Sequence, residues 1–104
     1  MKPIEMQAVI EGKRYNTQTA ILIADNGWWD GHNHERHGRN SFLYRTPRGA
    51  YFFMHRTCWE GENDRIETCS PDEAASFYES VQAHEDCVYL PYAEAFPSLK
   101  IEDA

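Results

Sequence analysis

The sequence lacks any long hydrophobic run. Its longest uncharged apolar stretch, Ala20 to Ala24, has five residues, whereas a membrane-spanning helix needs about 20. The first residues, Met-Lys-Pro-Ile-Glu-Met-Gln, also lack the apolar centre of a signal peptide. We therefore expect no membrane-spanning segment and a cytoplasmic location.

Cysteine, glycine and proline are also scarce. The three cysteines, Cys58, Cys69 and Cys87, cannot all pair within one chain, so we expect reduced thiols and no disulfide framework. Six glycines and five prolines are too few for a low-complexity chain. With 104 residues, 41% of them hydrophobic and 13% aromatic, the chain predicts a single domain over 1–104 with its own core. We expect residues 98–104 to form a loose tail.

Basic residues are few and unevenly placed along a chain of net charge −7. Residues 1–56 carry eight basic and five acidic side chains, a net charge of +3, whereas residues 57–104 carry two basic and twelve acidic ones, a net charge of −10. The first part could attract an anion, and the second would repel nucleic acid. The favoured alternative is that the two halves complement each other's charge within the fold.

The N-terminal quarter predicts a small hairpin and then an ambiguous element. Met6 to Ile10 reads as a strand, Glu11-Gly12-Lys13 as a turn and Arg14-Tyr15 as a return strand. Asn16 or Thr17 can cap a short helix that runs to Ala24. Ile21-Leu22-Ile23 could equally form a strand, so both alternatives stay open.

A second hairpin follows the polar stretch 26–41. Ser41 to Arg45 and Tyr51 to His55 predict two strands, joined by a tight turn at Thr46-Pro47-Arg48-Gly49. Asp64 to Thr68 predicts a third strand, with Ile66 inward and its two charged neighbours outward.

The C-terminal part predicts the main helix. Ser70-Pro71-Asp72-Glu73 combines an N-cap, a proline at the first helical position and a capping box. Ala74, Phe77, Tyr78 and Val81 then recur at helical spacing. Cys87 to Leu90 is expected to be extended, and Pro91 to Phe96 to make one helical turn. The predicted fold class is α+β: a small antiparallel sheet of three to four strands with one main helix, about 71–83, and one or two short helices.

Several short motifs resemble a family of small uncharacterised bacterial proteins found on chromosomes and on phage or other mobile elements. The motifs are Gly12-Lys13-Arg14-Tyr15 with Thr17 and Thr19-Ala20, Leu43 to Gly49 with Tyr51-Phe52-Phe53, Asp64 to Glu67, Glu73-Ala74 and Glu94 to Pro97. The resemblance implies no established activity, cofactor or catalytic residue. In that family the positions of His32, His34, His37, Cys58 and Cys69 often hold residues that bind no metal, so no shared metal site is implied.

Histidine and cysteine residues suggest one possible chemistry. His32, His34 and His37 lie within six residues, and His55 and Cys58 follow at a spacing of three. Zinc binds such ligands, but there is no Cys-x-x-Cys and no matched second pair at zinc-finger spacing. No nucleophile and base stand in a recognisable arrangement. The sequence therefore predicts no catalytic residue, no metal ligand and no cofactor.

A surface for binding is the favoured functional hypothesis. The basic hairpin mixes arginines with tyrosines, as single-strand-binding sheets do, but the acidic total favours aromatics in the core and arginines paired with acids. We expect a non-enzymatic interaction module with a protein partner, acting through the 26–41 loop and the exposed face of the hairpin, with nucleic acid less favoured.

A compact acidic protein from a mobile element could also interfere with host defence by mimicking nucleic acid. The alternative is a metal-dependent enzyme or metal-binding protein that uses His32, His34 and His37 with Cys58. The predicted binding residues are Trp28, Trp29, His32, Arg36, Arg39, Arg45, Arg48 and Trp59.

Overall fold

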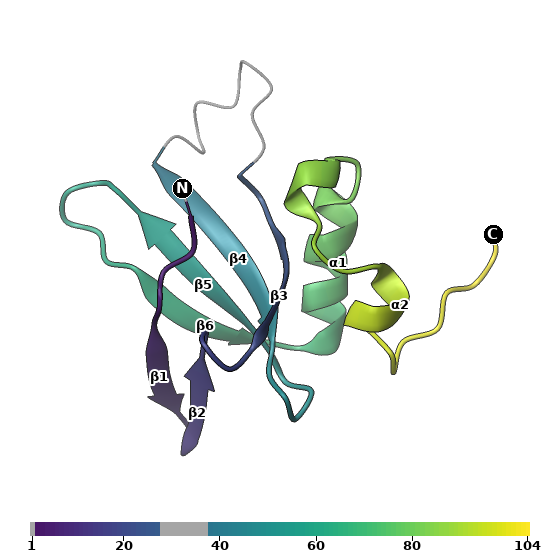
Figure 1. Ribbon diagram of the computed structural model, residues 1–104, viewed down its shortest axis with the longest axis horizontal. Coiled ribbons are helices and arrows are strands. Elements are labelled where there is room, and N and C mark those ends of the chain that lie inside the picture. Colours follow the sequence, from purple (N-terminus) through teal and green to yellow (C-terminus); the bar gives the residue numbers. More distant parts are fainter. Residues whose placement is uncertain (1, 28–37) are drawn as a thin grey trace.

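The computed structural model describes residues 2–27 and 38–104 and has the expected α+β architecture (Figure 1). In chain order the elements are β1 (Gln7–Ile10), β2 (Lys13–Asn16), β3 (Ile21–Asp25), β4 (Arg39–Arg45), β5 (Tyr51–Thr57), β6 (Arg65–Cys69), α1 (Pro71–Val81), the short 3₁₀ turn η2 (Glu85–Cys87) and α2 (Tyr92–Ala95). Strands β3, β4, β5 and β6 form one antiparallel sheet in that order, and β1 pairs with β2 in a separate two-stranded sheet.

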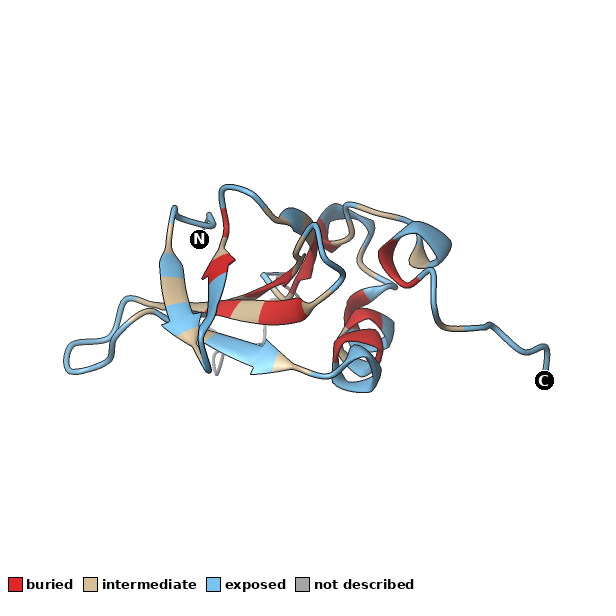
Figure 2. Ribbon diagram, turned by 90° about the horizontal axis from the view of Figure 1, so that it is seen from below, coloured by how far each residue is buried: buried red, intermediate tan, exposed pale blue. Residues whose placement is uncertain are grey.

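The four-stranded sheet has a core on each face because its central strands are apolar on both sides. Leu43 and Tyr51 face the core that α1 and α2 complete. Phe42 and Phe52 face a second core, which the β1–β2 hairpin covers. Figures 1 and 2 show the helices to one side of the sheet and the small hairpin at its other end. The 41–55 hairpin is therefore largely an interior element.

The predicted helix over 16–24 is wrong, and the strand alternative is correct. The Thr17 hydroxyl accepts a hydrogen bond from the Met6 amide at 2.9 Å instead of capping a helix. The Ala20 amide donates to the Asn16 carbonyl at 3.1 Å and closes a turn, after which the chain enters β3. Pairing with β4 and the β-branched side chains of Ile21 and Ile23 favour the extended form.

Strand β3 contains a shift in its pairing register that places two neighbouring residues in the core on the helix side of the sheet. Its pairing with β4 shifts between Leu22 and Ala24, so one extra residue is accommodated there. As a result Ile23 and Ala24, which are neighbours in sequence, are both fully buried in the same core. The outer side of β3 is closed by a bridge from Ala24 to Val88.

The predictions of the second hairpin and of the main helix are confirmed. β4 and β5 pair with Arg45 opposite Tyr51, on either side of the predicted turn. At the start of α1 the Ser70 hydroxyl accepts from the Glu73 amide, and the Glu73 carboxylate accepts from the Ser70 amide, both at 3.1 Å. This reciprocal pair satisfies two amides that the first helical turn would otherwise leave unbonded.

The buried stripe of α1 differs in one position from the predicted one. Ala74, Ala75, Tyr78 and Val81 are buried. Phe77 is only partly buried, and its ring meets that of Phe53 edge-on at 5.0 Å. The predicted turn at Pro91–Phe96 is α2, which places the fully buried Phe96 in the same core.

Strand β6 forms an edge of the four-stranded sheet beside β5, and three of its five residues are exposed. Arg65 and Glu67 are exposed and Ile66 is half-buried against the second core, as predicted. Charged side chains on an edge strand discourage unwanted pairing with other chains. Among the described residues no helix is long and apolar enough to cross a membrane.

Candidate binding surface

The predicted binding residues fall into three groups. Trp28, Trp29, His32 and Arg36 lie outside the described residues. Arg39 and Trp59 come together at the end of the sheet where β4 begins and β5 ends. Arg45 and Arg48 lie at the opposite end of the same hairpin. The structure therefore does not unite the predicted set into one surface.

Arg39 and Trp59 form a preorganised pair. The Arg39 guanidinium carbon lies 5.6 Å from the centroid of the Trp59 ring, within cation–π range. Glu62 holds the guanidinium with two hydrogen bonds of 3.0 and 2.6 Å, a bidentate arrangement. The Trp59 side chain keeps 51% of its surface exposed. An aromatic ring and a fixed guanidinium thus share one exposed site.

The β5–β6 loop holds Glu62 and Trp59 through Thr57. The Thr57 hydroxyl donates to Glu62 at 2.6 Å and accepts from the Trp59 amide at 3.1 Å. Asp64 accepts from the Thr57 amide at 2.8 Å and fixes the other end of the loop. The hydrogen bonds from Arg39 and Thr57 lower the pKa of Glu62 to about 2. Glu62 is therefore ionised, and the clamp intact, throughout the neutral range.

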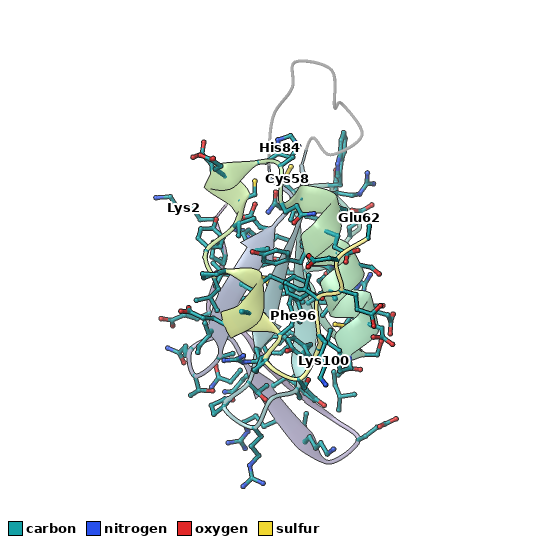
Figure 3. The ribbon with its side chains drawn as sticks, turned by 90° about the vertical axis from the view of Figure 1, so that its right-hand side faces the viewer. Lys2, Cys58, Glu62, His84, Phe96 and Lys100 are labelled. Carbon is teal, nitrogen blue, oxygen red and sulfur yellow. The ribbon has the colours of Figure 1, made fainter. Side chains whose placement is uncertain are left out.

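Gly38 permits the close approach of this loop to the start of β4. Its φ is +81°, and a β-carbon there would lie 2.5 Å from the Cys58 sulfur and 2.9 Å from the Trp59 Nε1 atom. The Gly38 carbonyl accepts from the Cys58 amide at 2.7 Å. Only glycine combines that backbone conformation with that contact. Figure 3 shows Cys58 and Glu62 toward the same end of the molecule.

A second polar group lies beside this pair on the helix side of the sheet. The Ser41 hydroxyl and His55 Nδ1 are 2.7 Å apart, and His55 Nε2 lies 2.9 Å from a Glu67 oxygen. The His55 hydrogen bond lowers the pKa of Glu67 below its ordinary value. These side chains come from three adjacent strands, with Ser41 directly opposite His55. A cavity of about 530 Å³ adjoins them, and its lining includes Arg39, Thr57 and Arg65.

This serine, histidine and glutamate chain can hold a proton in a defined place. The ionised Glu67 carboxylate only accepts, so His55 Nε2 donates to it. Acyl transfer would also need free donors for the developing oxyanion. The Ser41 amide already donates to Asn26 Oδ1 at 2.8 Å.

Arg45 has a structural role that the sequence did not suggest. Its guanidinium donates to the carbonyls of Glu94 and Ala95 at 2.6 and 3.2 Å, and the Tyr51 hydroxyl donates to the Ala95 carbonyl at 2.6 Å. Arg45 and Tyr51 thereby fasten α2 to the sheet. Tyr44 is buried in the second core. The aromatic part of the predicted exposed hairpin face is therefore wrong, and the favoured alternative of core aromatics is correct, whereas Arg48 is exposed.

The cysteines differ in their surroundings. Cys58 is exposed, Cys69 is half-buried and Cys87 is buried. Burial raises the pKa of the Cys69 thiol to about 12. Within the described part of the chain no three histidine, cysteine or acidic side chains gather as metal ligands would. The predicted alternative ligands His32, His34 and His37 lie outside that part.

Comparison with known proteins finds no family model that matches the chain, and no curated protein or solved structure with significant similarity. Function is therefore inferred from the geometry described above.

Proposed function

We propose that the protein is a non-enzymatic interaction module that binds another protein through the surface around Arg39 and Trp59. The observation that carries the proposal is the half-exposed Trp59 ring beside an Arg39 guanidinium fixed by Glu62. Tryptophan and arginine are the residues most enriched at the energetic centres of protein interfaces. Because both are already ordered, binding would sacrifice little side-chain entropy.

The charge of the whole chain, −7, supports a protein with a basic surface as the partner. At the site itself Glu62, Asp64 and Glu67 pair with Arg39, Arg56 and Arg65, so these charges offset one another. The acidic total disfavours nucleic acid as the partner. The resemblance to mobile-element proteins fits this chemistry, since a host-defence nuclease carries a basic surface of the kind an acidic mimic would cover.

Affinity capture with matched variants tests the proposal. The tagged protein is expressed in cells that naturally encode it, and captured proteins are quantified for the wild type, Trp59→Ala and Val9→Ala. Val9 is the control because it is 65% exposed and lies on β1, away from the site. We expect a partner that Val9→Ala retains and that Trp59→Ala loses at least tenfold, since an interface centre is worth about 2 kcal/mol or more. Equal capture by both variants would contradict the proposal.

A metal-binding function remains the second candidate because of the position of Cys58. Cys58 is exposed, and its amide donates to the carbonyl of Gly38, the residue that follows His37 in the sequence. Thiolate and imidazole groups are the ligands that zinc prefers. Elemental analysis of protein purified without added metal tests this candidate. Stoichiometric zinc that is lost in Cys58→Ser would favour it, and well under one equivalent would favour the interaction module.

A further inference from the structure

A groove lies at the opposite end of the β4–β5 hairpin from Trp59. The β1–β2 hairpin and the residues after β2 form one wall, and the turn between β4 and β5 forms the other. Its volume is about 610 Å³, within the range of small-molecule sites. The residues that line it are Gly12, Lys13, Arg14, Tyr15, Asn16, Thr19, Thr46, Pro47, Arg48 and Ala50. Two motifs that the sequence singled out, residues 12–15 and 46–49, thus meet at one site.

The charge of this groove is opposite to that of the whole chain. Lys13, Arg14 and Arg48 line it, and no acidic residue among the described ones does so. By contrast, Arg39 and Arg56 elsewhere are paired with carboxylates. Lys13, Arg14 and Arg48 form no ion pair within the described part of the chain. In a protein of net charge −7, three uncompensated cations around one hollow make a local site for an anion.

The backbone holds the two walls of the groove in fixed positions. Lys13 and Arg14 lie on β2, opposite Ile10 and Val9 of β1. Arg48 lies in a turn that two backbone hydrogen bonds of Thr46 close. The Thr46 amide donates to the Ala50 carbonyl at 2.8 Å, and the Thr46 carbonyl accepts from the Gly49 amide at 2.9 Å. Cations from two separate segments therefore border the groove, with Arg48 on one side and Lys13 and Arg14, whose side chains alternate along β2, on the other. This is how side chains usually surround a phosphate group, whose several oxygens accept from more than one cation.

We propose that this groove binds the phosphate group of a small phosphorylated molecule. The cations that border the groove neutralise the phosphate, and Asn16 and Thr19 border the space left for the rest of the ligand. The volume leaves room for more than a phosphate ion alone. This inference does not depend on the proposed protein-binding function, because the two sites lie at opposite ends of β4.

Titration calorimetry with four probes tests the inference: pyrophosphate, ATP, adenosine and a 5′-phosphorylated oligonucleotide, all at low salt. We expect saturable binding of pyrophosphate and ATP, none of adenosine, and affinity that falls as salt is raised. Equal affinity for pyrophosphate and ATP would assign recognition to the phosphates alone, whereas much tighter ATP binding would assign a nucleotide. No saturable binding of either anion would overturn the inference. Tighter binding of a 5′-phosphorylated oligonucleotide than of both small anions would overturn it as well.

Three variants locate the binding within the molecule. Arg14→Gln and Arg48→Gln should each weaken pyrophosphate binding about tenfold, the effect of losing one charge-assisted hydrogen bond. Lys100→Gln is the matched control, because Lys100 is exposed and lies outside the groove lining. Unfolding temperatures confirm that each variant is folded. Equal weakening by all three variants, or none by the two arginine variants, would overturn the assignment. Trp59→Ala should leave pyrophosphate binding unchanged, so failure of one site is distinguishable from failure of the other.

Discussion

Replacing Arg45 should destabilise the protein, whereas replacing Arg48 should not, although both are arginines of the same hairpin. Arg45 donates to two main-chain carbonyls of the α2 segment at 2.6 and 3.2 Å. A hydrogen bond from a charged donor contributes about 1.5–3 kcal/mol when shielded. Arg45 is only half-buried, so solvent screening reduces that figure. We expect Arg45→Met to lower the free energy of unfolding by about 1–2 kcal/mol.

Urea unfolding of the wild type and both variants measures this difference. For a domain of this size each kcal/mol corresponds to about 4–8 °C in unfolding temperature, so thermal melting provides a second readout. Arg48 is exposed, and Arg48→Met should change the free energy of unfolding by less than about 0.5 kcal/mol. Arg45→Met should also speed proteolysis near α2, because that segment loses its fastening. Equal stability of the two variants would refute the structural role of Arg45.

Three further predictions concern the helix, the core and the thiols. Ser70→Ala removes the cap of α1 and should cost about 0.5–2 kcal/mol in urea unfolding; an unchanged midpoint would show that the cap contributes nothing. Phe96→Ala, at a fully buried ring, should cost about 3–5 kcal/mol and clearly more than Phe77→Ala at a half-buried one; the reverse order would contradict the packing. Maleimide should label the exposed Cys58 well before Cys69, because burial raises the pKa of the Cys69 thiol to about 12. Mass spectrometry of peptides from briefly treated protein measures the order of labelling, and earlier labelling of Cys69 would contradict this prediction.

The second hairpin and the main helix could be predicted because their signals are local. Thr46-Pro47-Arg48-Gly49 specifies a turn within four residues, and Ser70 with Glu73 specifies a helix start within four. Neither signal depends on distant parts of the chain. Both elements therefore appear where the sequence placed them.

Strand β3 could not be decided from its own residues. The segment from Asn16 to Ala24 contains a possible cap and an apolar pattern compatible with either element. The structure resolves it through contacts distant in sequence: Thr17 bonds to Met6, and β3 pairs with β4. Such pairing overrides a weak local preference.

The candidate site was predictable only in part. Arg39 and Trp59 were both singled out, but their stacking requires the path of the β5–β6 loop, which sequence spacing does not fix. The contact between Ser41 and His55 could have been predicted from the turn. The turn places Arg45 opposite Tyr51, and the same register then places Ser41 opposite His55. Glu67 joins them from a third strand whose register no local turn determines.

The most direct test of the proposed binding surface is hydrogen–deuterium exchange of the protein alone and with its captured partner. We expect slower exchange in the partner complex for amides of residues 38–41 and 57–65, which surround Arg39 and Trp59. Residues 92–95 of α2 should exchange at the same rate in both samples. Slower exchange confined to α2 or to the β1–β2 hairpin, with none around Trp59, would contradict the proposal.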